Sequence, residues 1–346
     1  MQTRFLPRTG CVTALVIVSI GHVALGANGA GGVNVPATMK AISFTRFGDS
    51  SVLQYGDAPV PVPSAGELLV RVRAASVNPA DWKSRAGLYG KGPLSAPIIP
   101  GFDISGVVAR VGAGVTAFKA GDAIYAMLPL NRSGGYAQFA VVPAGNAVAK
   151  PKSTSDIDAA AVPLAALTAW QALFDAAKVA PGQTVLIHGG AGGVGHFAVQ
   201  LAKAKGAKVI ATASARNAGF LRTLGADQII DYRSVRFEDQ VKDVDAVLDT
   251  VGGETLKRSY GIVKKGGYLV SIVDDVDVAA LARHEIRGSH AIVRPDAGQL
   301  AEIGALIDAG KVKPHVSKIL NLEAAAAAQD ASAEGSTRGK IVLRIP

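Results

Sequence analysis

Cysteine is nearly absent from this chain of 346 residues. The single cysteine, Cys11, lies close to the N-terminus. The rest of the chain can therefore form no internal disulfide, and it offers no thiol for nucleophilic catalysis or for a cysteine-based zinc site. The six histidines are dispersed without the spacing of metal ligands. Two of them, His188 and His196, flank a glycine-rich stretch, where a histidine more often has a structural role in a turn or on a helix face than binds a metal. We expect no zinc.

Aromatic residues and runs of like charge are also scarce. Aromatics make up 5% of the chain, and the formal net charge of +9 comes from basic residues that are scattered along it. A nucleic-acid-binding protein usually gathers its basic residues on one surface, often with aromatics between them, so we expect no nucleic-acid partner. The positive excess can still attract a polyanionic small molecule. An apolar content of 49% is typical of a well-packed globular enzyme.

No apolar run is long enough for a comfortable membrane span, which needs about 20 residues. Residues 1–34 instead combine a basic start, an apolar stretch over residues 12–20 and a small-x-small site at Ala24-Leu25-Gly26. This order is typical of a secretory signal. Residues 1–26 therefore predict an exported (periplasmic) or leader-anchored protein, with membrane contact only through the leader. The alternative is a mis-assigned start, with Met39 opening a cytoplasmic protein.

One glycine-rich stretch, TVLIHGGAGGVGHFAVQLAKAKGAK at residues 184–208, organises the rest of the chain. A short apolar run predicts a buried strand, an apolar face at helical spacing predicts a helix, and residues 209–213 predict a second strand. The spacing Gly190-x-Gly192-x-x-Gly195 between them fits the dinucleotide fingerprint. Bare backbone N–H groups and a helix N-terminus favour a pyrophosphate there. The alternative is a glycine-rich structural turn. The residues of this loop predicted to bind the cofactor are Gly190, Gly192, Gly193, Val194 and Gly195, with the glycines meeting the pyrophosphate.

The end of the second strand indicates which nucleotide is bound. An NAD site usually places Asp or Glu about 20 residues after the glycines, where it holds the ribose 2′-hydroxyl. This chain has Ser214-Ala215-Arg216-Asn217 there, with no acid before Asp227. A hydroxyl beside a guanidinium suits a 2′-phosphate, so we predict NADP(H). The alternative is that Arg216 is a solvated charge at a helix start.

The pattern of the chain changes near residue 160. Up to that point short strands alternate with turns, and residues 67–74 have the period-2 pattern of a half-buried strand, which together predict a barrel-like β module. Strands and helices then alternate, which predicts a parallel, doubly wound α/β sheet. We expect the last strand, residues 340–345, to return to the N-terminal module. The predicted divisions are a leader and spacer at 1–34 and domains at 38–160, 161–285 and 286–346.

Several further motifs occur in a fixed order along the chain. They are ASVNPADWK at 75–83, PGFDISG at 100–106, LTAWQAL at 167–173, LGAD at 224–227, DTVGG at 249–253 and GKIVL at 339–343. With these motifs the sequence, from residue 39 onward, resembles the medium-chain dehydrogenase/reductase superfamily, in its zinc-independent quinone oxidoreductase branch. The resemblance implies a GroES-like β-barrel catalytic domain, a Rossmann NADP-binding domain inserted before its last segment, and an active site between them.

The resemblance also implies site residues. Zinc-dependent relatives carry Cys and His-Glu where this chain has Asn78 and Phe102-Asp103, which agrees with the lack of cysteine. By family position Asn78 is the first candidate to donate a hydrogen bond to the reacting oxygen, with Lys83, Tyr89 and Tyr125 as weaker candidates. The alternatives are that Asn78 only forms a turn before Pro79, and that the other three are packing or surface residues. For the cofactor, the implied contacts beyond the glycines are Thr168, Ser214, Arg216, Asn217, Tyr232 and Val251.

Without a metal to polarise an alcohol, hydride transfer needs an acceptor that is already electrophilic. Quinones and α,β-unsaturated carbonyls qualify, because conjugation spreads the incoming charge onto oxygen. We therefore expect an NADPH-dependent reductase of quinones, enones or 2-alkenals. The alternatives are a trans-2-enoyl thioester reductase and a non-catalytic NADPH-binding redox sensor. Family members are often homodimers, and the resemblance implies the same here.

Overall fold

The computed structural model describes residues 34–90 and 92–346. The predictions made for the leader therefore lie outside the described residues. Within the described ranges, no helix has the length and apolar character that crossing a membrane requires.

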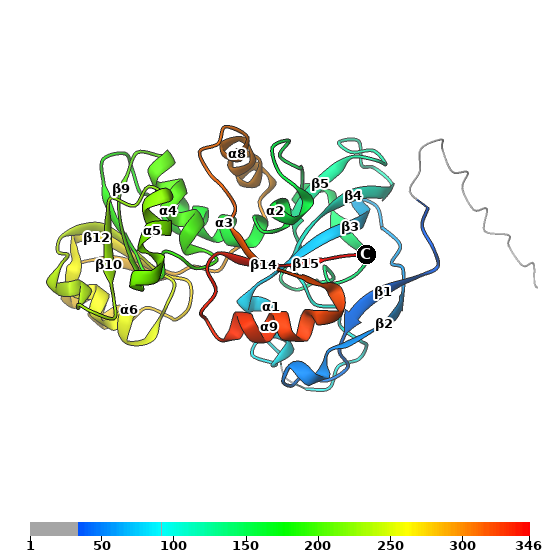
Figure 1. Ribbon diagram of the computed structural model, residues 1–346, viewed down its shortest axis with the longest axis horizontal. Coiled ribbons are helices and arrows are strands. Elements are labelled where there is room, and N and C mark those ends of the chain that lie inside the picture. The colour runs from blue at the N-terminus through cyan, green and yellow to red at the C-terminus, as the bar shows by residue number, and fades with distance from the viewer. Residues whose placement is uncertain (1–33, 91) are drawn as a thin grey trace, which may run out of the picture. The chain divides into compact units, whose positions relative to one another are not determined.

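The strands of the N-terminal module form two antiparallel-rich sheets (Figure 1). Strands β1 and β2 pair as a hairpin, and a seven-stranded sheet has the order β14-β15-β3-β4-β5-β7, with β6 paired to β3. The prediction that the last strand returns to this module is confirmed, because β15 pairs with β3. The strands are β1 (Thr38–Ser43), β2 (Gln54–Pro59), β3 (Glu67–Val77), β4 (Asp103–Val111), β5 (Ala123–Met127), β6 (Phe139–Pro143), β7 (Ala147–Ala149), β14 (Val316–Asn321) and β15 (Lys340–Arg344).

Strand β3 confirms the prediction of a half-buried strand over residues 67–74. One face is buried from Leu68 to Ala74, whereas Glu67 and Arg71 on the other face are partly exposed and Arg73 is exposed. Leu68, Val70 and Val72 pack in one hydrophobic cluster, while Leu69 packs in another that includes Met39 of β1. Leu69 is the one buried residue of the second face between residues 67 and 74. The strand is enclosed on both faces only at its end, where Ala75, Ser76 and Val77 are all buried.

The central module is a six-stranded sheet in which every pairing is parallel, in the order β10-β9-β8-β11-β12-β13. This confirms the doubly wound sheet, and the chain reverses direction across the sheet between β8 and β11. The sheet runs one strand past residue 285, the expected end of this domain. The strands are β8 (Thr184–Ile187), β9 (Lys208–Ala213), β10 (Gln228–Asp231), β11 (Val244–Asp249), β12 (Val263–Ser271) and β13 (Arg287–His290).

Helices cover the sheets, and short 3-10 turns join several of the elements. The segment that joins the two modules is helical in pieces, and it ends in a π-helical stretch at Gln171–Ala176. The α-helices are α1 (Pro79–Arg85), α2 (Asp156–Ala160), α3 (Pro163–Trp170), α4 (Gly195–Ala204), α5 (Ala218–Thr223), α6 (Gly253–Ser259), α7 (Val278–Arg283), α8 (Ala297–Asp308) and α9 (Ala325–Ala333).

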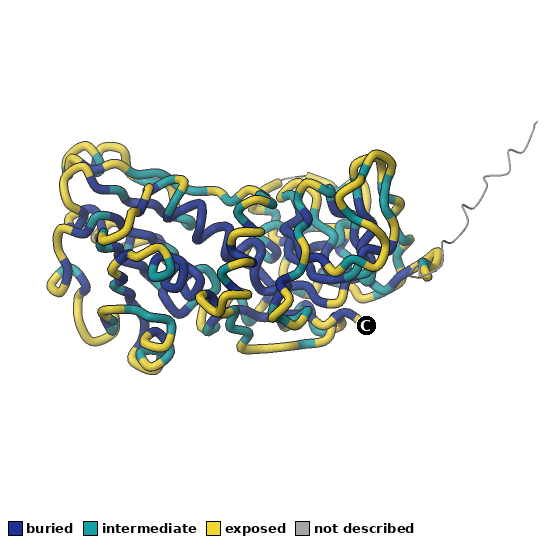
Figure 2. The backbone as a smooth tube through the Cα atoms, turned by 90° about the horizontal axis from the view of Figure 1, so that it is seen from above, coloured by how far each residue is buried: buried dark blue, intermediate teal, exposed yellow. Residues whose placement is uncertain are grey.

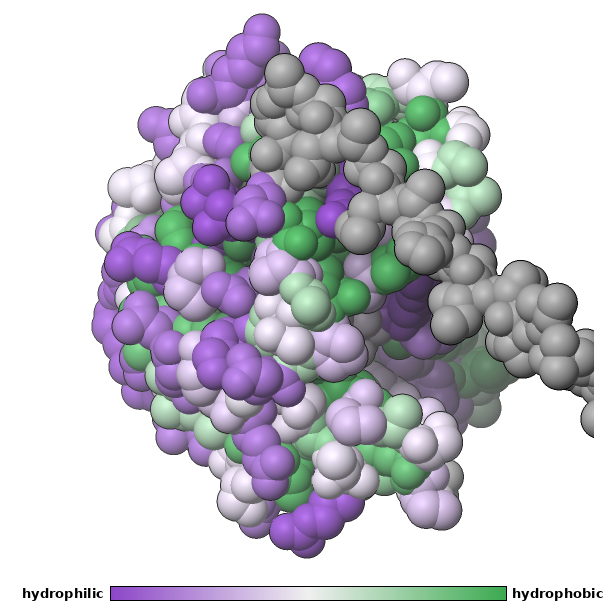
Figure 3. Space-filling view, turned by 90° about the vertical axis from the view of Figure 1, so that its right-hand side faces the viewer, coloured by the Kyte–Doolittle hydropathy of each residue, from purple (hydrophilic) through white to green (hydrophobic). Residues whose placement is uncertain are grey.

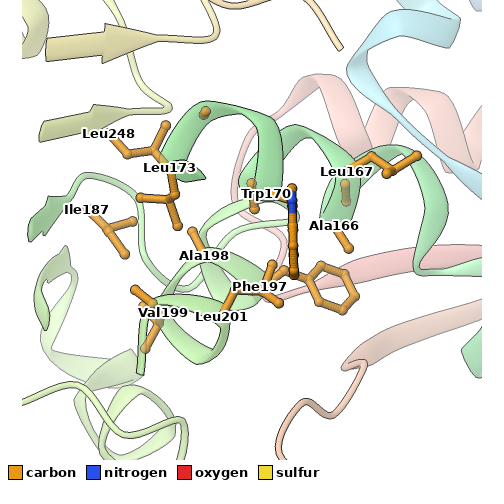
Figure 4. Close-up of a cluster of buried hydrophobic side chains, with 14 of the residues drawn as sticks. Ala166, Leu167, Trp170, Leu173, Ile187, Phe197, Ala198, Val199, Leu201 and Leu248 are labelled. Atoms are coloured by element: carbon orange, nitrogen blue, oxygen red, sulfur yellow. The ribbon is translucent and has the colours of Figure 1, made fainter. Parts of the chain in front are cut away.

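The core of the central module lies where α3 and α4 meet the sheet (Figure 4). All eight residues of α3 are buried, and α4 is buried from Gly195 to Ala202. The predicted apolar face of α4 is inside, and His196, Val199 and Gln200 are buried as well. Each large apolar side chain buried here contributes about 1.5–3 kcal/mol. This packing holds the N-terminus of α4 in place.

In both modules the buried segments run through the interior, and the connecting turns are exposed (Figure 2). On the face shown in Figure 3, hydrophilic residues are interspersed with hydrophobic ones. On this face the hydrophilic residues are therefore not gathered into a single patch.

Candidate active site

The glycine-rich turn joins β8 to α4, as the fingerprint predicts. Gly189 has a φ of +63°, and a Cβ there would lie 2.6 Å from Thr250 Oγ1. A Cβ on Gly195 would lie 2.2 Å from the Gly189 carbonyl oxygen, so the first turn of the helix packs directly on the backbone of the turn. At Gly192 and Gly193 the nearest atoms to such a Cβ are 3.3 and 3.4 Å away. Two glycines therefore permit the fold of the turn, and the other two leave bare backbone beside a cleft.

Two buried, neutral histidines fix this turn. His188 Nε2 lies 2.9 Å from Ser259 Oγ, whose own hydrogen goes to Thr255, so Nε2 is the ring donor. Its Nδ1 lies 3.2 Å from Thr212 Oγ1, which accepts a hydrogen bond from Gly189 N–H. Burial lowers the pKa of His188 to about 3. The hydrogen-bond pattern needs one protonated and one bare ring nitrogen, so the neutral form is the one that fits.

His196 has the same character on the other side of the turn. Its Nδ1 lies 2.9 Å from the Gly192 carbonyl oxygen, and its Nε2 accepts from His315 N–H at 3.3 Å. Burial lowers its pKa to about 3. Both histidines thus serve as structural ties, as the sequence indicated.

A cleft of about 530 Å³ runs past the glycine turn and is lined by both modules. Ser214, Arg216 and Arg233 line one end, and Asn78, Leu164 and Ile272 line the other. The cleft brings together most of the predicted site residues from segments far apart in the chain. These are Asn78, Lys83, Gly192, Gly193, Val194, Ser214, Arg216, Asn217, Tyr232 and Val251.

The remaining predicted residues do not line this cleft. Gly190 and Gly195 pack within the turn and the helix start. Thr168 is buried in α3, where its hydroxyl donates to the Leu164 carbonyl oxygen at 2.7 Å. Tyr89 is 66% exposed. Tyr125, the other weak candidate, is buried and donates its hydroxyl to the Leu300 carbonyl oxygen at 2.6 Å.

The turn before β15 forms a wall of the cleft that the sequence did not indicate. Gly339 N–H donates to the Ala191 carbonyl oxygen at 2.8 Å, which ties the C-terminal segment to the glycine turn. Arg338 Nε donates to Asn217 Oδ1 at 2.9 Å, and its Nη2 donates to the Arg216 carbonyl oxygen at 3.1 Å. In return Arg216 Nη2 donates to the Ser336 carbonyl oxygen at 3.3 Å. The partners in the three arginine bonds are about 120 residues apart in the sequence, and Gly339 is farther still from Ala191, so no local pattern joins them.

Asn78 is both the cap of α1 and part of the cleft. It has the extended backbone expected before a proline, and its N–H donates to Asp81 Oδ2 at 2.7 Å. Asp81 also accepts from the Tyr136 hydroxyl at 2.9 Å, and burial raises the pKa of Asp81 to about 7. The turn-forming alternative and the site prediction for Asn78 are therefore compatible.

Asn78 lies between two buried charged side chains, Lys340 and Asp103. Lys340 Nζ donates to Asn78 Oδ1 and, at 2.9 Å, to the Val77 carbonyl oxygen. Asn78 Nδ2 donates to Asp103 Oδ2 at 2.8 Å. Burial lowers the pKa of Lys340 and raises that of Asp103, and the attraction between the two charges opposes both changes. The GKIVL motif contains Lys340, but nothing in the motif shows that its ammonium group reaches Asn78.

Phe102 and Asp103, which the family resemblance sets at a zinc-ligand position, have other roles in the fold. In residues 34–90 and 92–346, no cluster of three or more His, Cys, Asp or Glu side chains could hold a metal ion. Phe102 is buried, and the Asp103 carboxylate already accepts hydrogen bonds from Ser76, Asn78 and Leu164. Independence from zinc stays a prediction, which a chelator tests.

Comparison with known proteins gives the same architecture. The alcohol dehydrogenase GroES-like domain family matches residues 64–152, and the zinc-binding dehydrogenase family matches residues 224–343. The chain is 34% identical over 321 residues to a 2-methylene-furan-3-one reductase of Solanum lycopersicum, covering 90% of this chain and 80% of the relative. It is 33% identical over 322 residues to a chloroplast envelope quinone oxidoreductase homolog of Arabidopsis thaliana, covering 88% and 98%.

Solved structures agree with these relatives. The quinone oxidoreductase from Coxiella burnetii superposes with a TM-score of 0.82 at 35% identity, covering 89% of this chain and all of that one. The Escherichia coli quinone oxidoreductase complexed with NADPH gives a TM-score of 0.80 at 29% identity, covering 88% and 99%. The chain belongs to the medium-chain dehydrogenase/reductase superfamily. Within it, these relatives place the chain in the quinone-oxidoreductase-like branch.

Proposed function

We propose that the chain is an NADPH-dependent reductase that transfers hydride to quinones or to α,β-unsaturated carbonyls such as enones and 2-alkenals. The observation that carries the proposal is the cleft, in which bare glycine backbone lies between a cationic end and an end with buried polar groups. The names of the relatives, a furanone reductase and quinone oxidoreductases, support the two acceptor classes.

The residues present fit NADP(H). The backbone at Gly192 and Gly193 and the N-terminus of α4 suit a diphosphate, since neither glycine has a side chain that would keep it away. Ser214, Arg216 and Arg233 suit a 2′-phosphate, because they offer a hydroxyl and two guanidinium groups at the same end of the cleft. These cofactor-binding groups are spread along the cleft, so the cofactor and the acceptor would bind in the same cleft.

At the other end of the cleft the chain's own groups can position an acceptor and receive charge. Leu164 and Ile272 give that end apolar walls, which exclude water from the reacting carbons. NADPH, when bound, supplies the hydride. The oxygen of the acceptor gains negative charge as hydride arrives, and polar N–H groups near Asn78 lie where they can stabilise it.

The proposal is tested by mixing purified protein with NADPH and a panel of acceptors, and following the loss of NADPH absorbance. We expect oxidation with a quinone or a 2-alkenal. Binding of NADPH without oxidation by any acceptor would favour the redox-sensor alternative. Turnover confined to enoyl thioesters would favour the thioester reductase.

Replacing Arg216 with alanine tests the assignment of the 2′-phosphate end. We expect the dissociation constant of NADPH to rise roughly tenfold to a hundredfold, because a hydrogen bond to a charged group contributes about 1.5–3 kcal/mol. NADH binding should change little, since it lacks the 2′-phosphate. Fluorescence titration with both cofactors measures this, and Arg222→Ala, on the exposed side of α5, is the control. An equal loss for the two cofactors would reject the assignment.

A chelator tests the prediction that no zinc is needed. Dialysis against a zinc chelator should leave the rate of NADPH oxidation unchanged, because the family resemblance implies that the Asn78 region and Phe102-Asp103 stand where zinc-dependent members carry Cys and His-Glu. A loss of rate that added zinc restores would contradict it.

The homodimer and the export of the protein also remain proposals, the first resting on the family resemblance and the second on residues 1–26.

A further inference from the structure

The ammonium group of Lys340 is buried at the wall of the cleft. The side chain is 3% exposed and lines the cleft together with Asn78. Its stem lies beside the glycine turn, where Cδ is 3.4 Å from the position of a Cβ on Gly193. Its Nζ reaches away from the turn to the Val77 carbonyl oxygen and Asn78 Oδ1. A buried ammonium is costly unless it is paired, so its position needs an explanation.

The counter-charge is Asp103, and Asn78 joins the two. The Asn78 amide has a defined orientation, because its oxygen accepts from Lys340 and its nitrogen donates to Asp103. The other partners of Asp103, the Ser76 hydroxyl at 2.8 Å and Leu164 N–H at 2.7 Å, are donors as well. A carboxyl group with three donors around it and no acceptor is ionised. The ammonium therefore keeps its charge while standing one amide away from the carboxylate.

This arrangement leaves two N–H groups without an acceptor. A protonated lysine has three donors, of which Lys340 uses two, and an asparagine amide has two, of which Asn78 uses one. In the described part of the chain, no hydrogen bond takes up either of the remaining donors. Both residues line the cleft, at the end opposite Arg216.

We propose that Lys340 and Asn78 form an oxyanion site, with the Lys340 ammonium as its principal donor. The inference rests on the proposed function and names the group that receives the charge. In an enone, hydride from NADPH forms a C–H bond at the β-carbon, the electron pair of the C=C bond moves to give an enolate, and NADPH becomes NADP⁺. The enolate oxygen accepts from Lys340 and Asn78, and water then protonates the α-carbon. Lys340 keeps its own proton throughout.

A fixed ammonium stabilises the enolate oxygen by charge, which is what a metal ion does for an alkoxide. Because Asp103 and the Val77 carbonyl hold the ammonium before the substrate arrives, little reorganisation is needed during the reaction. The same site suits a quinone. Hydride transfer to a quinone gives a hydroquinone anion, whose negatively charged oxygen accepts hydrogen bonds from Lys340 and Asn78 until solvent protonates it.

The test compares Lys340→Met, Lys340→Arg and a matched control, Lys318→Met, in which an exposed lysine on the neighbouring strand β14 is changed. We expect Lys340→Met to bind NADPH within about twofold of the wild type and to transfer hydride roughly 10²–10³-fold more slowly in single turnovers, the usual cost of removing an oxyanion donor. Lys340→Arg should recover part of the rate, and Lys318→Met should match the wild type.

A second readout does not depend on turnover. 4-Nitrophenol changes its visible absorbance when it ionises, so it reports on an oxyanion site directly. With NADP⁺ present, we expect the bound phenol to ionise at a pH at least about one unit lower than the free phenol in the wild type, a tenfold preference for the anion. Lys340→Met should lose this shift.

The outcomes separate the two proposals. Wild-type protein that oxidises no NADPH with any acceptor overturns the proposed function. Wild-type protein that turns over but binds 4-nitrophenol without a shift overturns the oxyanion site alone, as does a Lys340→Met variant whose only loss is in NADPH affinity. Should Lys340→Met unfold because Asp103 loses its counter-charge, Lys340→Met/Asp103→Asn removes both charges and is measured in its place. A normal hydride-transfer rate in that double variant also overturns the site.

Discussion

Gly195→Ala is expected to abolish measurable NADPH binding and to lower the free energy of unfolding by about 3 kcal/mol, the upper range for inserting a methyl group into a packed interior. The new Cβ would lie 2.2 Å from the Gly189 carbonyl oxygen and 2.8 Å from Gly190 Cα. Both contacts are with backbone, so no side chain can rotate away. The turn itself must move, and the bare N–H groups that suit a diphosphate move with it.

Urea unfolding and NADPH titration of the purified variant measure the two effects. Gly219→Ala is the matched control, because it makes the same change in α5, where nothing lies within 4 Å of the new Cβ. That variant should bind NADPH normally and gain about 0.5–1 kcal/mol, since alanine favours a helix over glycine by that amount. If Gly195→Ala bound NADPH as the wild type does, the turn would not be the diphosphate site.

The second large effect is a loss of stability in acid that comes from His196. Because its folded-state pKa is lowered to about 3, the unfolded chain binds a proton below pH of about 6.5 while the folded protein does not. Stability from this residue is therefore present above that pH and is lost as the pH falls towards 3. At a pH of about 5 the loss is about 2 kcal/mol.

The measurement is the difference between the wild type and His196→Asn, whose amide can still donate to the Gly192 carbonyl oxygen. Between neutral pH and a pH of about 5, the wild type should lose about 2 kcal/mol more than the variant in urea unfolding. Asp81, whose pKa is raised to about 7, changes stability in the opposite sense, but it does so in both proteins and cancels. Parallel pH profiles would show that His196 takes up a proton in the folded state.

The parts of the fold that could be predicted from the sequence are those in which local pattern and chain order agree. The unit from β8 to β9 shows a strand, a turn and a helix in direct succession, so the periodicities and the glycine spacing predicted it to within a residue or two. The alternation of strands and helices also predicted the parallel sheet. The extra strand β13 lay beyond the predicted boundary because Arg287–His290 has no apolar run to mark it.

The candidate site was predictable only on the side formed by local motifs. Ser214 and Arg216 follow β9 directly, so their place at the cleft could be read from position along one strand. Lys340 meets Asn78 across 262 residues, and Arg338 meets Asn217 across 121. Such pairs are set by how β15 inserts beside β3, which residue spacing alone does not encode.

The placement of β15 joins the glycine turn to the barrel sheet through one short piece of chain. Gly339 N–H donates to the Ala191 carbonyl oxygen, and the residues that follow it pair with β3. A ligand that stiffens the glycine turn therefore stiffens the start of β15 as well. We expect coenzyme binding to slow hydrogen exchange at the amides of β15, including those that the coenzyme does not touch.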